Sequence, residues 1–172
     1  AVYVEKDAKG LSFGLQESLM GWNGVPSADI FLDSVEVPKE NMVVDSDGGF
    51  KKLMEAFDLE RCGNATMCLG QASGALEQAL QYVQEREQFG KPIVEFQAVQ
   101  MKLAEMAMKV EASRLLIYRA AHNAEEGFPS IFESSVGKCF SNETAREVVA
   151  SAMQLMGGYG FNKEYTMERR YR

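Results

Sequence analysis

The chain has few of the residues that build metal sites and disulfide frameworks. Histidine occurs once and cysteine three times in 172 residues, with no C-x-x-C pair, which argues against zinc-ribbon and haem-attachment sites. We therefore predict no metal site. The odd number of thiols favours a reducing compartment, in which cysteine serves as a small buried hydrophobic residue. We expect a cytoplasmic or mitochondrial-matrix protein that is not secreted.

Long apolar runs and an excess of positive charge are also missing. No segment approaches the roughly 20 consecutive apolar residues that a membrane-spanning helix needs, and no charged region followed by an apolar one opens the chain. Lys and Arg number 18 against 25 Asp and Glu, so the net charge is -7, which repels phosphate backbones and anionic membranes. The sequence predicts neither a nucleic-acid partner nor a membrane partner.

Short alternating apolar and polar runs occupy the first forty residues. They lie at residues 1–5, 11–15, 28–33 and 34–37, bounded by Gly, Pro and Asn, a pattern typical of short β-strands. Pro38 ends the last of them. Because the first run has no polar residues before it, we expect a piece of a longer protein. Residues 1–44 are interpreted as the C-terminal part of a β-domain.

From residue 50 onward, apolar residues recur at helical spacing. The stripe Leu69, Ala72, Leu76, Leu80 and Val83 predicts one long helix to about residue 87. Further helices are predicted from about 99 to 127, from Ser130 to the glycines at 157–160, and from about Glu164 onward. Long helices with short connections pack antiparallel. We expect a mainly α fold, in which residues 45–172 form an up-down antiparallel bundle that stops before its last helices.

The end of the first long helix carries Arg86 next to a Phe-Gly turn. A planar guanidinium at this place can hold a pyrophosphate through two parallel N–H groups, while the ring of Phe89 covers an adenine. In the alternative interpretation, Arg86 interacts with the dipole of its own helix and Phe89 is a core residue. The motif by itself leaves both interpretations open.

The third long helix ends in a glycine-rich stop. Three of the four residues at 157–160 are glycine, and Gln154 precedes them by one turn. Missing side chains let the backbone approach a flat or charged ligand, to which Gln154 adds an amide. Such a stop is also common in purely structural proteins. It does not match the strand-linked G-x-G-x-x-G of Rossmann folds.

Taken together, four stretches resemble the acyl-CoA dehydrogenase family. They are residues 19–23, residues 56–61, residues 85–91 with Gln97, and residues 154–161. The last is the most specific, because the family's C-terminal signature is filled in order by Gln154, Gly157, Gly158, Gly160, Phe161, Glu164 and Arg169. The resemblance covers essentially the whole chain, from the end of the middle β-domain through three helices of the C-terminal bundle.

This resemblance implies FAD as the cofactor, bound across an interface of a homo-oligomer, either a dimer or a tetramer. In the family, the arginine and the phenylalanine of the first helix end touch the FAD of a neighbouring subunit. The residues that the resemblance assigns to the cofactor are Arg86, Gln88, Phe89, Gln97, Gln154, Gly157 and Gly158.

The resemblance also places substrate residues on the first long helix. It implies that Arg61 contacts the CoA moiety, with Phe57 and Asp58 lining the same entrance. The family's catalytic base is usually a glutamate on a segment after the last helix seen here, but the isovaleryl-type enzymes place it just before this arginine, where the chain has Glu60. A base there would remove the α-proton while the flavin takes a hydride from the β-carbon. The alternative is a surface glutamate paired with Arg61 or with a residue one turn away.

The function that the resemblance predicts is that of an FAD-dependent acyl-CoA dehydrogenase. Such an enzyme oxidises an acyl-CoA thioester to the 2,3-enoyl-CoA and passes electrons to an electron-transfer flavoprotein. Two alternatives are a non-catalytic helical oligomerisation module and a related acyl-CoA oxidase. Since the family's N-terminal helical domain and first β-strands are not among these 172 residues, we expect the chain by itself to bind FAD poorly and to be inactive.

Overall fold

The computed structural model describes residues 1–45, 47–125 and 127–172, and it divides the chain into two compact units, Ala1–Met54 and Glu55–Arg172. The first unit contains little regular structure. Its strands β1 (Leu11–Phe13) and β2 (Ile30–Leu32) pair antiparallel, and the 3₁₀ turn η1 spans Lys39–Asn41.

Two of the predicted strands are present in shortened form, as β1 and β2, whereas those at residues 1–5 and 34–37 are wrong. In the described part of the chain, Val2 forms only an isolated bridge with Met42, and Ser34 has a φ of 52°. A positive φ takes the backbone out of the extended region. Next to that bridge, the backbone N–H groups of Tyr3 and Val43 donate to the carbonyls of Asn41 and Ala1 at 2.8 and 2.9 Å. The pairing does not extend along the rest of the predicted run, so alternation alone did not make a strand there.

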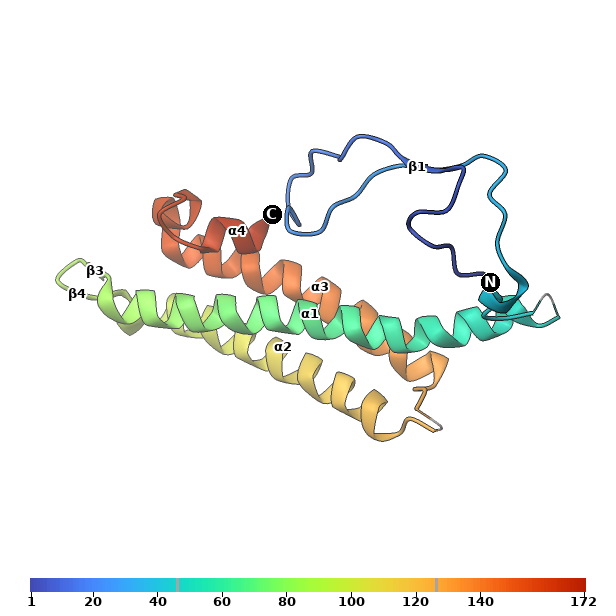
Figure 1. Cartoon of the computed structure of the whole chain (residues 1–172). Helices are drawn as coiled ribbons and strands as arrows, with labels where there is room; N and C mark the ends of the chain where they lie inside the picture. Colours follow the sequence, from blue (N-terminus) through green and yellow to red (C-terminus); the bar gives the residue numbers. More distant parts are fainter. Residues whose placement is uncertain (46, 126) are drawn as a thin grey trace. The chain divides into compact units, whose positions relative to one another are not determined.

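The predicted up-down antiparallel helical bundle is confirmed. The long helices are α1 (Gly49–Glu85), α2 (Gln97–His122) and α3 (Ile131–Met156), and the chain reverses direction between them (Figure 1). A short helix, α4 (Met167–Tyr171), follows α3. Figure 1 shows the small hairpin of β3 (Glu87–Gln88) and β4 (Lys91–Pro92) at the end of α1, and the 3₁₀ turn η2 (Ile93–Glu95) leads from it into α2.

Capping and turn chemistry set the ends of the later helices. Ser130 caps α3, since its Oγ accepts a hydrogen bond from the Glu133 backbone N–H at 3.2 Å. The fourth helix begins later than the predicted Glu164. There the backbone N–H of Glu164 donates to Oδ1 of Asn162 at 2.9 Å, which holds a local turn in competition with the helix. As a result α4 begins only at Met167.

The core of the bundle combines small residues on α1 with larger ones on α2 and α3. Small side chains allow close approach of neighbouring helices, and the larger side chains then fill the remaining space. The buried cluster consists of Ala65, Leu69, Ala72, Ala75, Ala79 and Val83 on α1, Leu103, Met106, Val110 and Ile117 on α2, Ala145, Val148, Val149, Ala152, Leu155 and Met156 on α3, and Met167 on α4.

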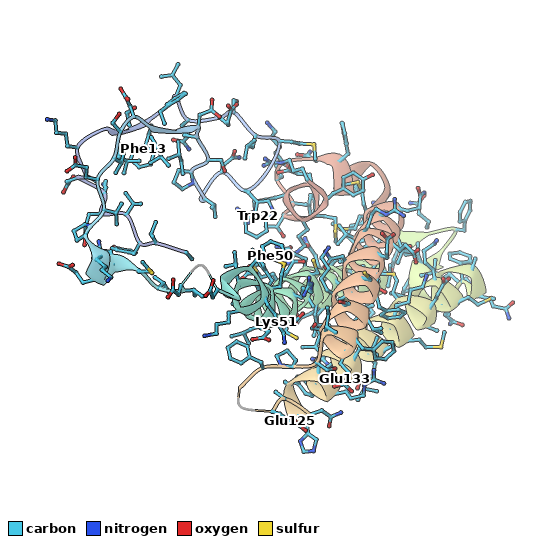
Figure 2. All side chains as sticks on the ribbon, turned by 90° about the vertical axis from the view of Figure 1, so that its right-hand side faces the viewer. Phe13, Trp22, Phe50, Lys51, Glu125 and Glu133 are labelled. Carbon is cyan, nitrogen blue, oxygen red and sulfur yellow. The ribbon has the colours of Figure 1, made fainter. Side chains whose placement is uncertain are left out.

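The connection between α2 and α3 is held by polar contacts of one carboxylate. Glu133 accepts a hydrogen bond from Nδ2 of Asn123 at 2.9 Å and pairs with Nε of Arg119 at 3.2 Å. Figure 2 labels Glu133 at the start of α3 and Glu125 in the connection. These contacts tie the last turn of α2 to the first turn of α3 and so fix the antiparallel reversal.

Within the described residues, none of the helices combines the length and the apolar character that crossing a bilayer requires. In the same part of the chain, His, Cys, Asp and Glu side chains do not gather in groups of three or more that could hold a metal ion. Cys62, Cys68 and Cys139 are free thiols.

Candidate functional site

An open cavity of about 410 Å³ lies at one end of the helical unit, where the end of α1, the β3–β4 hairpin and the segment after α3 meet. Its lining residues are Tyr82, Arg86, Gln88, Ile93, Gln154, Leu155, Met156, Gly157, Gly158, Tyr159 and Asn162. Five of the residues predicted to bind the cofactor are among them, namely Arg86, Gln88, Gln154, Gly157 and Gly158. The fold therefore brings the helix-end motif and the glycine-rich stop into one cavity.

Arg86 is fixed through its backbone at the junction of helix and hairpin. Its N–H donates to the carbonyl of Tyr82 at 2.9 Å, and its carbonyl accepts from the N–H of Ile93 at 2.8 Å. The guanidinium carbon lies 5.5 Å from the centre of the Tyr159 ring, within the range of a cation–π contact. Among the described residues, none of the ion pairs involves Arg86. Its positive charge is therefore available to a ligand.

The tip of the hairpin displays Phe89. Phe89 and Gly90 both have positive φ, 56° and 79°, as a two-residue type I′ hairpin turn requires. The Phe89 side chain is 92% exposed, so the alternative of a core phenylalanine does not hold. Its ring lies perpendicular to that of Phe96, with the ring centres 6.1 Å apart. Gln97, the first residue of α2, is exposed as well, and neither Phe89 nor Gln97 lines the cavity.

The glycine-rich segment forms the other wall of the cavity. Gly157 ends α3 with a φ of 58°, and the 3₁₀ turn η3 spans Gly157–Phe161. A Cβ at Gly160 would lie 2.8 Å from the carbonyl oxygen of Met153, so a side chain there would collide with α3. Glycines at these two positions let the chain fold back onto the helix end. The backbone of Gly157 and Gly158 is left exposed at the cavity surface.

Three tyrosines, which the sequence interpretation missed, pack beside Arg86. The ring centres are 6.2 Å apart for Tyr82 and Tyr159, 5.5 Å for Tyr159 and Tyr165, and 6.5 Å for Tyr82 and Tyr165. Burial raises the pKa of Tyr82, an effect that the nearby positive charge of Arg86 partly opposes. Helical spacing could have pointed to Tyr82, one turn before Arg86, and the glycine-rich signature that contains Tyr159 could have pointed to that residue. Nothing local marked Tyr165.

The predicted substrate residues lie together near the start of α1. Asp58 is 7% exposed, forms an ion pair with Arg61, and accepts a hydrogen bond from Oγ of Ser134 at 3.2 Å. This carboxylate therefore faces α3, whereas Phe57 and Glu60 are exposed. The ion pair that the structure gives Arg61 is with Asp58. The Arg61 side chain is 32% exposed, so it is partly accessible from solvent.

The two groups of predicted site residues are far apart. At a rise of about 1.5 Å per residue, α1 separates Glu60 from Arg86 by about 39 Å. The fold thus collects most of the cofactor residues at one end of the bundle and the substrate residues near the other end. A single chain does not bring the two groups into one cavity.

Cys62 follows Arg61 directly but is not activated as a nucleophile. Burial raises the pKa of its thiol, and the negative charge of Asp58 raises it further. A raised pKa leaves little thiolate near neutral pH. The expectation of buried cysteines is wrong for Cys139, which is exposed, and Cys62 and Cys68 are only half-buried.

Comparison with known proteins identifies the same family as the sequence motifs. Residues 47–172 match the family described as "Acyl-CoA dehydrogenase, C-terminal domain". The caffeyl-CoA reductase-Etf complex subunit CarC of Acetobacterium woodii is 41% identical over 172 residues, which is 100% of this chain and 45% of that protein. The 3-(aryl)acrylate reductase of Clostridium sporogenes is 40% identical over 169 residues, 98% of this chain and 45% of that protein. The probable acyl-CoA dehydrogenase FadE25 of Mycobacterium tuberculosis is 39% identical over 170 residues, 98% of this chain and 44% of that protein.

Solved structures agree with these relatives. Butyryl-CoA dehydrogenase from Megasphaera elsdenii matches with a TM-score of 0.94 and 36% identity, over 99% of this chain and 44% of that one. Glutaryl-coenzyme A dehydrogenase in its glutaryl-CoA complex matches with a TM-score of 0.90 and 32% identity, over 96% of this chain and 42% of that one. The chain thus spans less than half the length of the proteins that it matches. It belongs to the acyl-CoA dehydrogenase family, whose C-terminal domain it matches over residues 47–172.

Proposed function

We propose that the protein is an FAD-dependent acyl-CoA dehydrogenase, which oxidises an acyl-CoA thioester to the 2,3-enoyl-CoA. The observation that carries the proposal is the cavity in which Arg86, Gln88 and Gln154 meet the exposed backbone of Gly157 and Gly158. These residues come from distant parts of the sequence, and family membership independently supports the same function.

The chemistry of the cavity fits the diphosphate and neighbouring groups of FAD. It offers one cation that no described carboxylate neutralises, three side-chain amides, exposed glycine backbone and two tyrosines, of which Tyr159 contacts the cation. Its volume of about 410 Å³ lies in the ordinary range of small-molecule pockets, and a dinucleotide would occupy it only in part. When bound, FAD supplies the acceptor for the substrate hydride.

Each cofactor residue has a proposed task that follows from its position. Arg86 binds the diphosphate through its guanidinium N–H groups, and the amides of Gln88 and Gln154 orient the ligand. Phe89, exposed at the hairpin tip, covers the adenine. Gln97 lies exposed at the start of α2 and contacts the same cofactor outside the cavity.

The substrate residues act at the other end of α1. Arg61, oriented by the buried carboxylate of Asp58, binds a CoA phosphate, and Phe57 lines the entrance. Glu60 is exposed beside them and removes the α-proton of the thioester. A substrate that covers Glu60 removes water from it, and loss of water strengthens a carboxylate as a base.

The separation of the two groups favours a homo-oligomer, either a dimer or a tetramer. A distance of about 39 Å along α1 is too long for one ligand to join Arg86 and Glu60 of the same chain. In the proposed assembly, Arg86 and Phe89 of one subunit contact the FAD of its neighbour. Each active site is then completed by two chains.

The proposed electron partner is an electron-transfer flavoprotein. One relative is named as a subunit of a caffeyl-CoA reductase-Etf complex, and another is named a 3-(aryl)acrylate reductase. These names favour a second candidate function, the reduction of a 2,3-enoyl-CoA by the same residues working in the opposite direction. A flavin-free oligomerisation module and an oxygen-reducing oxidase are the remaining alternatives.

The test is a visible absorption spectrum of the purified natural-length protein after FAD is added and free flavin is removed. Acyl-CoA thioesters of several lengths are then added under anaerobic conditions. We expect retained flavin that bleaches with substrate. We expect Glu60→Gln to retain flavin without bleaching, while Glu77→Gln, another exposed glutamate on α1, bleaches normally.

Each alternative has its own signature in this experiment. A natural-length protein that retains no flavin would overturn the proposal in favour of an oligomerisation module. Rapid oxygen consumption with acyl-CoA would identify an oxidase, whereas reoxidation by an electron-transfer flavoprotein supports the dehydrogenase. Oxidation of chemically reduced protein by an enoyl-CoA, without the forward reaction, would favour the reductase. Normal bleaching of the flavin in the Glu60→Gln variant would show that the catalytic base is a residue of another segment.

A further inference from the structure

Tyr159 is one of two tyrosines, among the described residues, that line the cavity, and its ring lies against the guanidinium of Arg86. It occupies the non-glycine position within the sequence 157–160, and its ring centre lies 5.5 Å from the guanidinium carbon of Arg86. Both residues line the cavity. Neither the sequence motifs nor the comparisons assign this tyrosine a role.

The ring of Tyr159 is held in place although it is 44% exposed. Tyr165 meets it at an interplanar angle of 64°, and Tyr82 lies on α1 with its ring centre 6.2 Å away. The carbonyl of Tyr159 accepts a hydrogen bond from the Asn162 backbone N–H at 3.2 Å. Aromatic pairs of this kind favour defined ring orientations. Tyr159 is therefore a fixed support for a neighbouring side chain.

Arg86 needs such a support. An arginine side chain has many rotamers, so ordering it costs entropy on ligand binding unless the free protein already restricts it. A carboxylate could restrict it, but a carboxylate would also neutralise the charge and repel an anion. An aromatic face attracts the guanidinium while the charge remains available.

We propose that Tyr159 is a positioning residue, whose ring holds the Arg86 guanidinium in the cavity for the diphosphate of a dinucleotide. This inference rests on the proposed function, because that function supplies the dinucleotide. The contact acts through the face of the ring, and the phenolic hydroxyl is not required. Tyr159 therefore changes the affinity for the ligand only by positioning Arg86, and it makes no contribution through a direct contact with the ligand.

The test measures the dissociation constant for FAD by equilibrium dialysis of the purified natural-length protein. We expect Tyr159→Leu to weaken binding about two- to fivefold, as loss of a partly exposed cation–π contact predicts. We expect Tyr159→Phe to bind as tightly as the wild type. Tyr159→Trp offers a larger aromatic face and is expected to retain or improve the affinity, so the test still stands if the leucine variant fails to fold.

A double-mutant cycle separates positioning from direct contact. In an Arg86→Gln background, Tyr159→Leu should cause no further loss of FAD affinity, because there is no guanidinium left to position. The same fractional loss in both backgrounds would overturn the proposal, as would a loss in Tyr159→Phe equal to that in Tyr159→Leu. If the wild type binds no FAD, the proposed function fails, and the same cycle with ADP as the diphosphate probe then decides the role of Tyr159.

Discussion

At the scale of single residues, Phe89 at the hairpin tip has a backbone conformation and a solvent exposure that are both unfavourable for phenylalanine. Phe89 has a φ of 56° and an exposed fraction of 92%, so it gains little from burial while it occupies a region that favours Gly, Asn and Asp. Strained and exposed residues of this kind are a feature of binding sites. The geometry supports a contact of Phe89 with a ligand or partner outside the hairpin.

We therefore expect Phe89→Asn to stabilise the fold while weakening FAD binding. Asparagine tolerates positive φ, so the free energy of unfolding should rise by about 0.5–1 kcal/mol, measured by guanidinium denaturation. Phe89→Ala is the matched control, because alanine removes the ring without relieving the backbone strain. Equal stability of the two variants would contradict the argument from φ.

The pKa of Cys62 gives a second prediction at this scale. Because folding raises the thiol pKa above its ordinary value of 9.0, the folded state retains the proton to higher pH than the unfolded state. The resulting stabilisation is complete below pH 9.0 and is lost as the pH rises through the folded pKa.

Alkylation with iodoacetamide measures this pKa directly, since only the thiolate reacts. We expect the Cys62 rate, followed by peptide mass spectrometry, to have its midpoint above pH 9.0. The exposed Cys139 serves as the internal control and should react faster at neutral pH. Asp58→Asn should lower the Cys62 midpoint only in part, because burial is the larger cause. A wild-type midpoint below 9.0 would contradict the assignment.

At the scale of elements, α1 and α3 meet through polar as well as apolar contacts. Ser134 donates to Asp58, and Nδ2 of Asn142 donates to Oδ1 of Asn64 at 2.9 Å. Within the described residues, the buried Oδ1 of Asn142 has no hydrogen-bond partner. These polar side chains oppose any shift of α1 along α3, because a shift would break their hydrogen bonds and leave buried polar groups without partners, which costs free energy.

The asparagine pair should therefore show strong coupling in a double-mutant cycle. Asn64→Ala leaves the Asn142 amide without its acceptor and should cost about 1–3 kcal/mol of unfolding free energy. The double variant, with alanine at both positions, should cost less than the sum of the single variants. Gln81→Ala removes an exposed hydrogen bond to Glu85 on the same helix and should change stability by less than about 0.5 kcal/mol. Additive losses at the asparagines would show that the pair is not coupled.

At the scale of the whole molecule, the long α1 determines how an active site can be assembled. Its length keeps the substrate residues and the cavity about 39 Å apart, so one chain supplies parts of two different sites in the proposed oligomer. This arrangement makes an experiment with mixed subunits informative. A chain with an inactivating change among the substrate residues can form a working site with a chain that is changed among the cofactor residues.

We expect activity to return when the Arg86→Gln and Glu60→Gln variant proteins, each inactive alone, are unfolded and refolded together. In a mixed dimer, one site receives the intact Glu60 of the first chain and the intact Arg86 of the second. Random pairing should make about a quarter of all sites intact, measured as acyl-CoA-dependent bleaching of the flavin. Refolding of either variant alone is the control. Absence of any recovery, in mixtures whose wild-type control refolds to full activity, would contradict the sharing of each site between two chains.

Local patterns in the sequence were enough to predict the helical part of the fold. Apolar spacing located α1, α2 and α3, and the glycines at 157–160 marked the end of α3, because helix periodicity and glycine conformation are properties of neighbouring residues. The strand predicted at 34–37 failed because strand formation depends on a partner elsewhere in the chain. The predicted start of α4 was too early, because the side chain of Asn162 accepts a hydrogen bond from the backbone N–H of Glu164 and holds a turn there.

What the sequence by itself determined about the site was the identity of its motifs, including Arg86 and the glycine-rich stop. Only the tertiary structure decided that these two form one cavity, that Tyr159 lies against Arg86, and that Asp58 is turned toward α3. It also decided that the substrate residues lie at a distance from that cavity. The physical reason is that such contacts join residues far apart in the chain. They are fixed by the packing of α1 against its neighbours, which no local spacing encodes.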